Sequence, residues 1–128
     1  MKKKYLIVIA NYYEDISNGL LNSALKIIPK SNVIRIIKVP GIFEIPVTIS
    51  KNIKKYDGFL ALGCVIKGET PHFEFISQAS TNAIMDLSIL NKKPIGNGII
   101  TCLNKRQAKD RKKKGAEAAE AVISVLSQ

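Results

Sequence analysis

The stretch with the clearest chemical content is Gly68–Phe75 (GETPHFEF), which holds the only histidine of the chain, His72. Thr70 followed by Pro71 is typical of a helix start, because threonine caps exposed backbone amides and proline fits the first helical position. The imidazole then lies in the first helical turn. The partial positive charge of a helix N-terminus disfavours its protonation, so the sequence predicts a neutral imidazole that can accept a proton.

The backbone amides that precede this helix predict an anion site. Exposed N–H groups at a helix N-terminus bind phosphate, and here they belong to Gly68, Glu69 and Thr70. One loop can therefore present both a phosphate site and a general base. The alternative is a simple helix cap with a surface histidine, which is the commoner meaning of such a stretch taken alone.

A basic run near the C-terminal end offers a second set of candidates. Within it, Arg111 and Lys114 are three residues apart and would share one face of a helix. The planar guanidinium group suits phosphate oxygens, whereas the lysine ammonium is a movable point charge. A solvated helix surface is the alternative. The run comprises Lys105, Arg106, Lys109, Arg111, Lys112, Lys113 and Lys114.

Two further side chains follow predicted strands. Glu44, in the segment GIFEIP, precedes a helix. Its carboxylate can interact with the helix amides or accept hydrogen bonds from sugar-like hydroxyls. Tyr12 can stack on a planar ring, or it can cover the end of the core.

Composition limits the class of protein. The 128 residues fit one domain, 1–128, and the 20 basic and 10 acidic residues give a net charge of +10. No aromatic residue interleaves the basic run, so base stacking has no platform and we expect no nucleic-acid partner. Cys64 and Cys102 lack paired CxxC spacing, so we expect free thiols and no metal site. No apolar run approaches the roughly 20 residues that cross a bilayer, and we expect a cytoplasmic protein with no membrane partner.

The pattern of apolar residues predicts alternating strands and helices. The predicted strands are Tyr5–Ala10, Val33–Val39, Asp57–Gly63 and Pro94–Thr101. The predicted helices are Ile16–Ile28, one beginning near Pro46, one along Ile76–Leu90, and a region from the cap Asn104 to about Leu126 that Gly115 would break. Such alternation predicts βαβ units, and hence a parallel sheet with helices on both faces. Ligands of such sheets bind beyond the carboxyl ends of the strands, and we expect the candidate residues, Asn97 included, to follow strand ends.

Four segments, in order along the chain, carry a family resemblance. They are GIFEIP, LGCVIKGETPHFEFIS, GNGIITCLNKRQAKDR and KGAEAA. Together they resemble the 6,7-dimethyl-8-ribityllumazine synthase family over essentially the whole chain. The resemblance implies a three-layer flavodoxin-like fold with a four-stranded parallel sheet. It also implies a step of riboflavin biosynthesis, the condensation of 5-amino-6-ribitylaminouracil with 3,4-dihydroxy-2-butanone 4-phosphate, with no metal or redox cofactor.

The resemblance assigns roles to individual residues. His72 matches the catalytic histidine, and Tyr12 matches the aromatic residue that stacks on the substrate ring. The ribityl-binding stretch matches Ile42, Phe43 and Glu44, and the pyrimidine-edge contacts match Cys64, Val65 and Ile66. The phosphate-binding positions match Glu69, Thr70 and Arg111, and Lys114 matches a lysine near the pyrimidine ring.

The resemblance further implies a pentamer or an assembly of pentamers. The site would be shared, with Asn97, Arg111 and Lys114 supplied by the adjacent chain. This chain departs from the family in two places: Asn97 stands where many relatives have an aromatic residue, and about four residues fewer separate Arg111 from Lys114. Two alternatives remain, a related enzyme that joins two lumazines into riboflavin and a non-catalytic flavin or lumazine carrier.

Overall fold

The computed structural model of the protein describes residues 2–68 and 71–128. Its strands are β1 (Lys4–Ala10), β2 (Val33–Val39), β3 (Gly58–Ile66) and β4 (Ile95–Cys102). Its helices are α1 (Glu14–Ile27), the short 3-10 helix η1 (Ile42–Glu44), α2 (Ile45–Asn52), α3 (His72–Asn91), α4 (Lys105–Asp110) and α5 (Lys114–Leu126).

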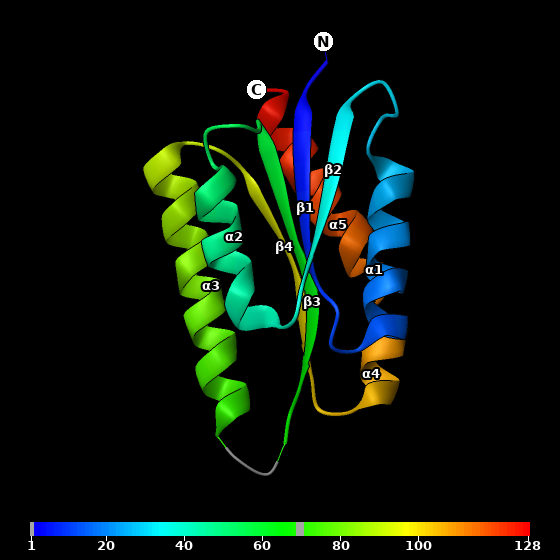
Figure 1. The fold of residues 1–128 in the computed structure, drawn as a ribbon. Helices are drawn as coiled ribbons and strands as arrows, with labels where there is room; N and C mark the ends of the chain where they lie inside the picture. Colours follow the sequence, from blue (N-terminus) through cyan, green and yellow to red (C-terminus); the bar gives the residue numbers. More distant parts are fainter. Residues whose placement is uncertain (1, 69–70) are drawn as a thin grey trace.

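The four strands form one parallel sheet in the order β2-β1-β3-β4. In the centre, Tyr5 of β1 lies opposite Gly58 of β3, and Ile9 lies opposite Leu62. Parallel strands end at a common edge, and the carboxyl ends of all four lie at the lower end of the view in Figure 1. The predicted four-stranded parallel sheet is confirmed.

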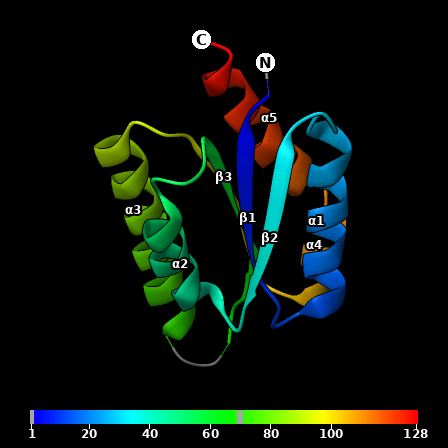
Figure 2. The same ribbon diagram turned by 45° about the horizontal axis from the view of Figure 1, so that its top comes forward.

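Helices cover both faces of this sheet, with α2 and α3 on one side and α1, α4 and α5 on the other (Figures 1 and 2). Side chains of a strand alternate between the two faces. Leu6 and Val8 of β1 accordingly pack in the core under α2 and α3, whereas Ile7 and Ile9 pack in the core under α1 and α5. All four are fully buried. The predicted three-layer flavodoxin-like arrangement is therefore confirmed.

Three details of the predicted elements are wrong. β3 does not end at Gly63 as predicted. It continues through Cys64–Ile66, because these residues pair with β4. Asn97 lies within β4, opposite Ala61, and does not follow a strand. The last helical region breaks at residues 111–113 and continues through Gly115. Arg111 and Lys114 therefore lie on either side of this break and do not share one helix.

The turn between α4 and α5 is held by helix α1. The Ser23 hydroxyl donates a hydrogen bond to the Lys112 carbonyl (2.8 Å) and accepts one from the Ala116 amide (2.9 Å). Next to it, a Cβ on Gly115 would collide with the carbonyl oxygen of Leu20 and lie 2.7 Å from Ser23 Oγ. The close approach of α1 and α5 thus depends on the missing side chain of Gly115, which explains why a helix continues through a glycine.

We predict that Gly115→Ala lowers the free energy of unfolding by about 2 kcal/mol, because the added methyl group meets backbone that cannot move away cheaply. Urea denaturation at a fixed chain concentration measures the change. Gly68→Ala is the matched control, since among the described residues, chain neighbours apart, no atom lies within 4 Å of a Cβ there, and we expect a change below about 0.5 kcal/mol. Equal stability of the two variants would contradict this account of the contact between α1 and α5.

Candidate active site

A pocket of about 360 Å³ opens at the carboxyl ends of β1 and β3. This is the place where a parallel sheet of this kind binds ligands. It brings together seven of the predicted site residues. They are Tyr12, Ile42, Phe43, Cys64, Val65, Ile66 and His72.

Tyr12 comes from the turn that joins β1 to α1. The turn is fixed by its backbone: the Asn11 amide donates to the Val39 carbonyl (3.0 Å), and the buried Ser17 hydroxyl donates to the Ala10 carbonyl (2.6 Å). The side chain of Tyr12 itself is 76% exposed. An aromatic ring on a fixed backbone therefore stands at the mouth of the pocket, as stacking on a planar ligand requires.

The helix η1 places the predicted ribityl-binding stretch. Ile42 is buried, and a Cβ on Gly63 of β3 would collide with its Cδ1 atom, so that glycine makes room for η1 against the sheet. Phe43 is 73% exposed and lies on the pocket wall. Glu44 is absent from this lining; it faces a neighbouring groove between α2 and α3, of which Phe43 and Ile76 are also part.

The end of β3 forms the floor of the pocket. Cys64 and Val65 are buried, and Ile66 is partly exposed. Pairing between β3 and β1 ends at Leu62, so the last residues of β3 extend past β1. Burial raises the pKa of the Cys64 thiol to about 12, with a further contribution from the neighbouring Cys102. Cys64 is therefore a neutral wall of the pocket and not a nucleophile.

His72 is the first residue of α3 and lines the pocket. Its predicted place in the first helical turn is confirmed. The N-cap of this helix is Pro71, one residue after the predicted cap Thr70, and the Pro71 carbonyl accepts a hydrogen bond from the Phe75 amide (3.2 Å). The predicted phosphate positions Glu69 and Thr70 lie outside the described residues.

Tyr13 also lines the pocket and was missed in the sequence. Its ring meets that of Tyr12 edge to face, with centroids 4.9 Å apart and an angle of 86° between the planes. Burial raises the pKa of the Tyr13 phenol, as do Tyr12 and Cys64. A pair of adjacent tyrosines directly after a buried strand was the available signal.

Three further predicted residues gather in a second pocket, of about 720 Å³, beside the edge strand β4. Asn97, Arg111 and Lys114 all line it, together with Thr81 and Glu117. The Arg111 guanidinium donates to the Thr101 carbonyl (3.3 Å), and the Lys114 ammonium lies 3.9 Å from the Glu117 carboxylate. The lining holds three cationic side chains, Arg111, Lys113 and Lys114, and two carboxylates, Asp110 and Glu117, so it keeps a small excess of positive charge.

The predicted functional groups lie in two separate pockets. The strand-end pocket offers an imidazole and aromatic rings, and the β4-edge pocket offers cations. No residue is common to the two linings as the structure describes them. A site that held a planar ring beside a phosphate group would need side chains from both pockets, and the described residues of one chain do not bring these into a single cavity.

Comparison with known proteins identifies the family. Residues 2–128 match the sequence model of the family described as 6,7-dimethyl-8-ribityllumazine synthase. The chain belongs to this family. Among its relatives, 6,7-dimethyl-8-ribityllumazine synthase of Bartonella tribocorum is 44% identical over 99% of this chain and 91% of its own length. The protein of the same name from Bartonella bacilliformis is 45% identical over 95% and 87%.

The part of the chain that the structure describes holds no cluster of metal ligands and no helix that could span a membrane. Within residues 2–68 and 71–128, no three histidine, cysteine, aspartate or glutamate side chains are grouped so that they could hold a metal ion. Over the same ranges, every helix is too short or too polar to cross a membrane.

We predict that Cys64 resists alkylation in the folded protein. With a pKa of about 12, only about one thiol in 10⁴ is ionised near pH 8, and the side chain is buried as well. Iodoacetamide labelling followed by peptide mass spectrometry should show modification at least about 100 times slower than in guanidinium chloride, where both cysteines react. Rapid labelling of Cys64 in the folded protein would contradict its assignment as a neutral wall.

Proposed function

We propose that residues 1–128 form one catalytic domain that condenses 5-amino-6-ribitylaminouracil with 3,4-dihydroxy-2-butanone 4-phosphate, giving 6,7-dimethyl-8-ribityllumazine, phosphate and water. Family membership over residues 2–128 supports the reaction. The observation that carries the proposal for this chain is the strand-end pocket, which joins His72, Tyr12 and the end of β3. We also propose a cytoplasmic location and small-molecule substrates, with no nucleic acid or membrane as partner.

The residue types suit the chemistry. An amine attacks a ketone, an imine forms, phosphate leaves and the ring closes, so the steps require proton transfer and orientation. His72 would transfer the protons, while the ring of Tyr12 would stack on the pyrimidine. Beyond Leu62, β3 is no longer paired with β1. The backbone of Cys64–Ile66 would therefore form hydrogen bonds with the edge of the pyrimidine ring.

The anionic end of the ketone substrate requires cations and amides. Arg111 would bind the phosphate with its planar fork, aided by the backbone amides of Glu69 and Thr70. Lys114 would lie near the pyrimidine ring, and Asn97 would face it with a polar side chain in place of an aromatic one. Ile42, Phe43 and Glu44 would hold the ribityl chain; a carboxylate oxygen of Glu44 lies 3.2 Å from the Cβ position of Gly41, a residue that lines the pocket.

These roles require neighbouring chains, and we propose a homopentamer or a multiple of pentamers. The separation of the two pockets supports a site completed between adjacent copies. Exposed apolar side chains on the α2–α3 side support association. They are Phe43, Val47, Phe75, Met85, Ile89 and Leu90.

Incubation of the purified protein with both substrates tests the activity. We expect the absorbance of the lumazine to appear with one phosphate per turnover. Lumazine alone should yield no riboflavin, which separates the proposal from the riboflavin-forming alternative. Folded protein that binds lumazine and shows no turnover would indicate the carrier alternative and contradict the proposal.

We predict that His72→Ala lowers kcat about 100-fold, because general acid–base catalysis typically contributes at least this much. Lumazine affinity should stay within about twofold, since the ring would be held by Tyr12 and β3. Gln78→Ala, at an exposed position of the same helix, is the control and should leave both values unchanged. An unchanged kcat in His72→Ala would show that positioning alone drives the reaction.

We predict that two impaired variants restore each other. Arg111→Ala should raise KM for the phosphorylated ketone, and His72→Ala should lower kcat. If each site joins His72 of one copy to Arg111 of the next, mixed assemblies from co-expression contain about a quarter of intact sites. Their kcat/KM should therefore exceed that of either variant assembled alone. Activity equal to the mean of the two would mean that both residues serve one site from the same chain.

A further inference from the structure

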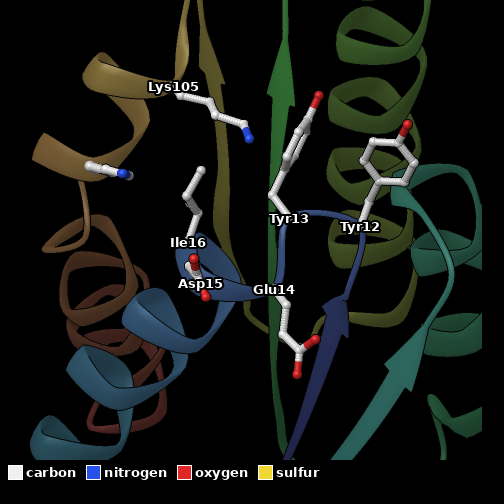
Figure 3. Close-up of a pocket in the computed structure, with 7 residues that line it drawn as sticks. Tyr12, Tyr13, Glu14, Asp15, Ile16 and Lys105 are labelled. Atoms are coloured by element: carbon white, nitrogen blue, oxygen red, sulfur yellow. The ribbon is translucent and has the colours of Figure 1, made fainter.

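Three side chains stand in a row beside the strand-end pocket, and Figure 3 shows them in the order Lys105, Tyr13, Tyr12. We infer that Tyr13 and Lys105 are positioning residues that fix the ring of Tyr12 for stacking on the pyrimidine. The inference rests on the proposed function, in which Tyr12 is the stacking residue. It assigns roles to two side chains outside the set expected from the family resemblance.

Tyr12 needs an orienting contact because its side chain is 76% exposed. A ring that rotates freely loses conformational freedom when a ligand stacks on it, and that loss weakens binding. The ring contact that the structure gives Tyr12 is with Tyr13, at 4.9 Å and 86°. This edge-to-face geometry is favoured by the charge distribution of aromatic rings. The orientation of the Tyr12 ring therefore follows that of Tyr13.

Tyr13 is in turn held from the backbone, the core and the solvent side. It is the N-cap of α1, and its carbonyl accepts a hydrogen bond from the Ser17 amide (2.9 Å). Its half-buried ring packs against the core under α1 and α5. The ammonium of Lys105 lies 5.8 Å from the ring centroid, within the range of a cation–π contact.

Lys105 is itself placed by a helix cap. It begins α4, whose N-cap Asn104 accepts a hydrogen bond from the Gln107 amide (3.0 Å). The segment from β4 through this cap thus places the Lys105 ammonium beside the ring of Tyr13, as Figure 3 shows. The orientation of the Tyr12 ring is therefore coupled to α4. This helix contributes Lys105 and Lys109 to a small pocket that Tyr12 and Tyr13 also line.

A double-mutant cycle on lumazine binding tests the inference. The dissociation constant of 6,7-dimethyl-8-ribityllumazine is measured by equilibrium dialysis for wild type, Tyr13→Leu, Tyr12→Ala and the double variant. We expect Tyr13→Leu to weaken binding about three- to tenfold when Tyr12 is present. In the Tyr12→Ala background the same change should have almost no effect, because Tyr13 acts through Tyr12.

Surface variants keep the test independent of folding. Lys105→Met should weaken lumazine binding about twofold by removing the cation–π contact. Lys109→Met is the matched control, since Lys109 and Lys105 line the same small pocket beside Tyr13 and, within the described ranges, Lys109 has no cation–π contact; binding should be unchanged. Tyr13→Phe keeps the ring and should bind like wild type. In steady state, Tyr13→Leu should raise KM for the pyrimidine substrate and leave that for the phosphorylated ketone unchanged.

The outcomes separate this inference from the proposed function. Equal loss of affinity in both Tyr12 backgrounds, or no loss in Tyr13→Leu and Lys105→Met, would overturn the positioning role while leaving the reaction intact. An equal loss in Lys105→Met and Lys109→Met would replace it by a general effect of charge. A wild-type protein that neither binds lumazine nor forms it would contradict the proposed function, and the inference with it.

Discussion

The register between the two central strands is the constraint on which the site depends. β1 and β3 are parallel and paired from Tyr5 opposite Gly58 to Ile9 opposite Leu62. β1 ends soon after, whereas β3 continues to Ile66 because β4 pairs with it. The turn that follows β1 therefore lies beside Cys64–Ile66, the last residues of β3, which are not paired with β1. A shift of register by one residue would move every buried side chain of these strands to the wrong face and separate the pocket walls.

The same sheet also explains why the chemistry is divided. The ends of the central strands form the strand-end pocket, whereas the edge strand β4, which includes Asn97, forms the second pocket with Arg111 and Lys114. An edge strand is the part of a sheet that another chain can approach. In a single chain the imidazole of His72 and the cations Arg111 and Lys114 line separate pockets, and in the proposed assembly an adjacent copy would bring them together. Oligomerisation would then be part of the active site.

The sequence predicted those parts that depend on local signals. Buried runs gave the four strands, and the residues after β1 and at the start of α3 were correctly expected near one another, since parallel strands share a carboxyl edge. Features set by tertiary contacts were missed. Glycine propensity suggested a break at Gly115, but packing against Leu20 requires a glycine inside α5. The contact between the Tyr12 and Tyr13 rings and the position of Glu44 in the α2–α3 groove depend on side-chain packing that no local pattern encodes.

The central claim is that the strand-end pocket of one copy and the β4-edge pocket of the next make one site. A crystal structure with bound 6,7-dimethyl-8-ribityllumazine and phosphate tests it most directly. The account predicts the lumazine ring on Tyr12 and the end of β3, His72 between ring and phosphate, and Arg111 of a neighbouring copy on the phosphate. Ligands held by residues of one chain alone, with the β4 edge of every copy open to solvent, would contradict it.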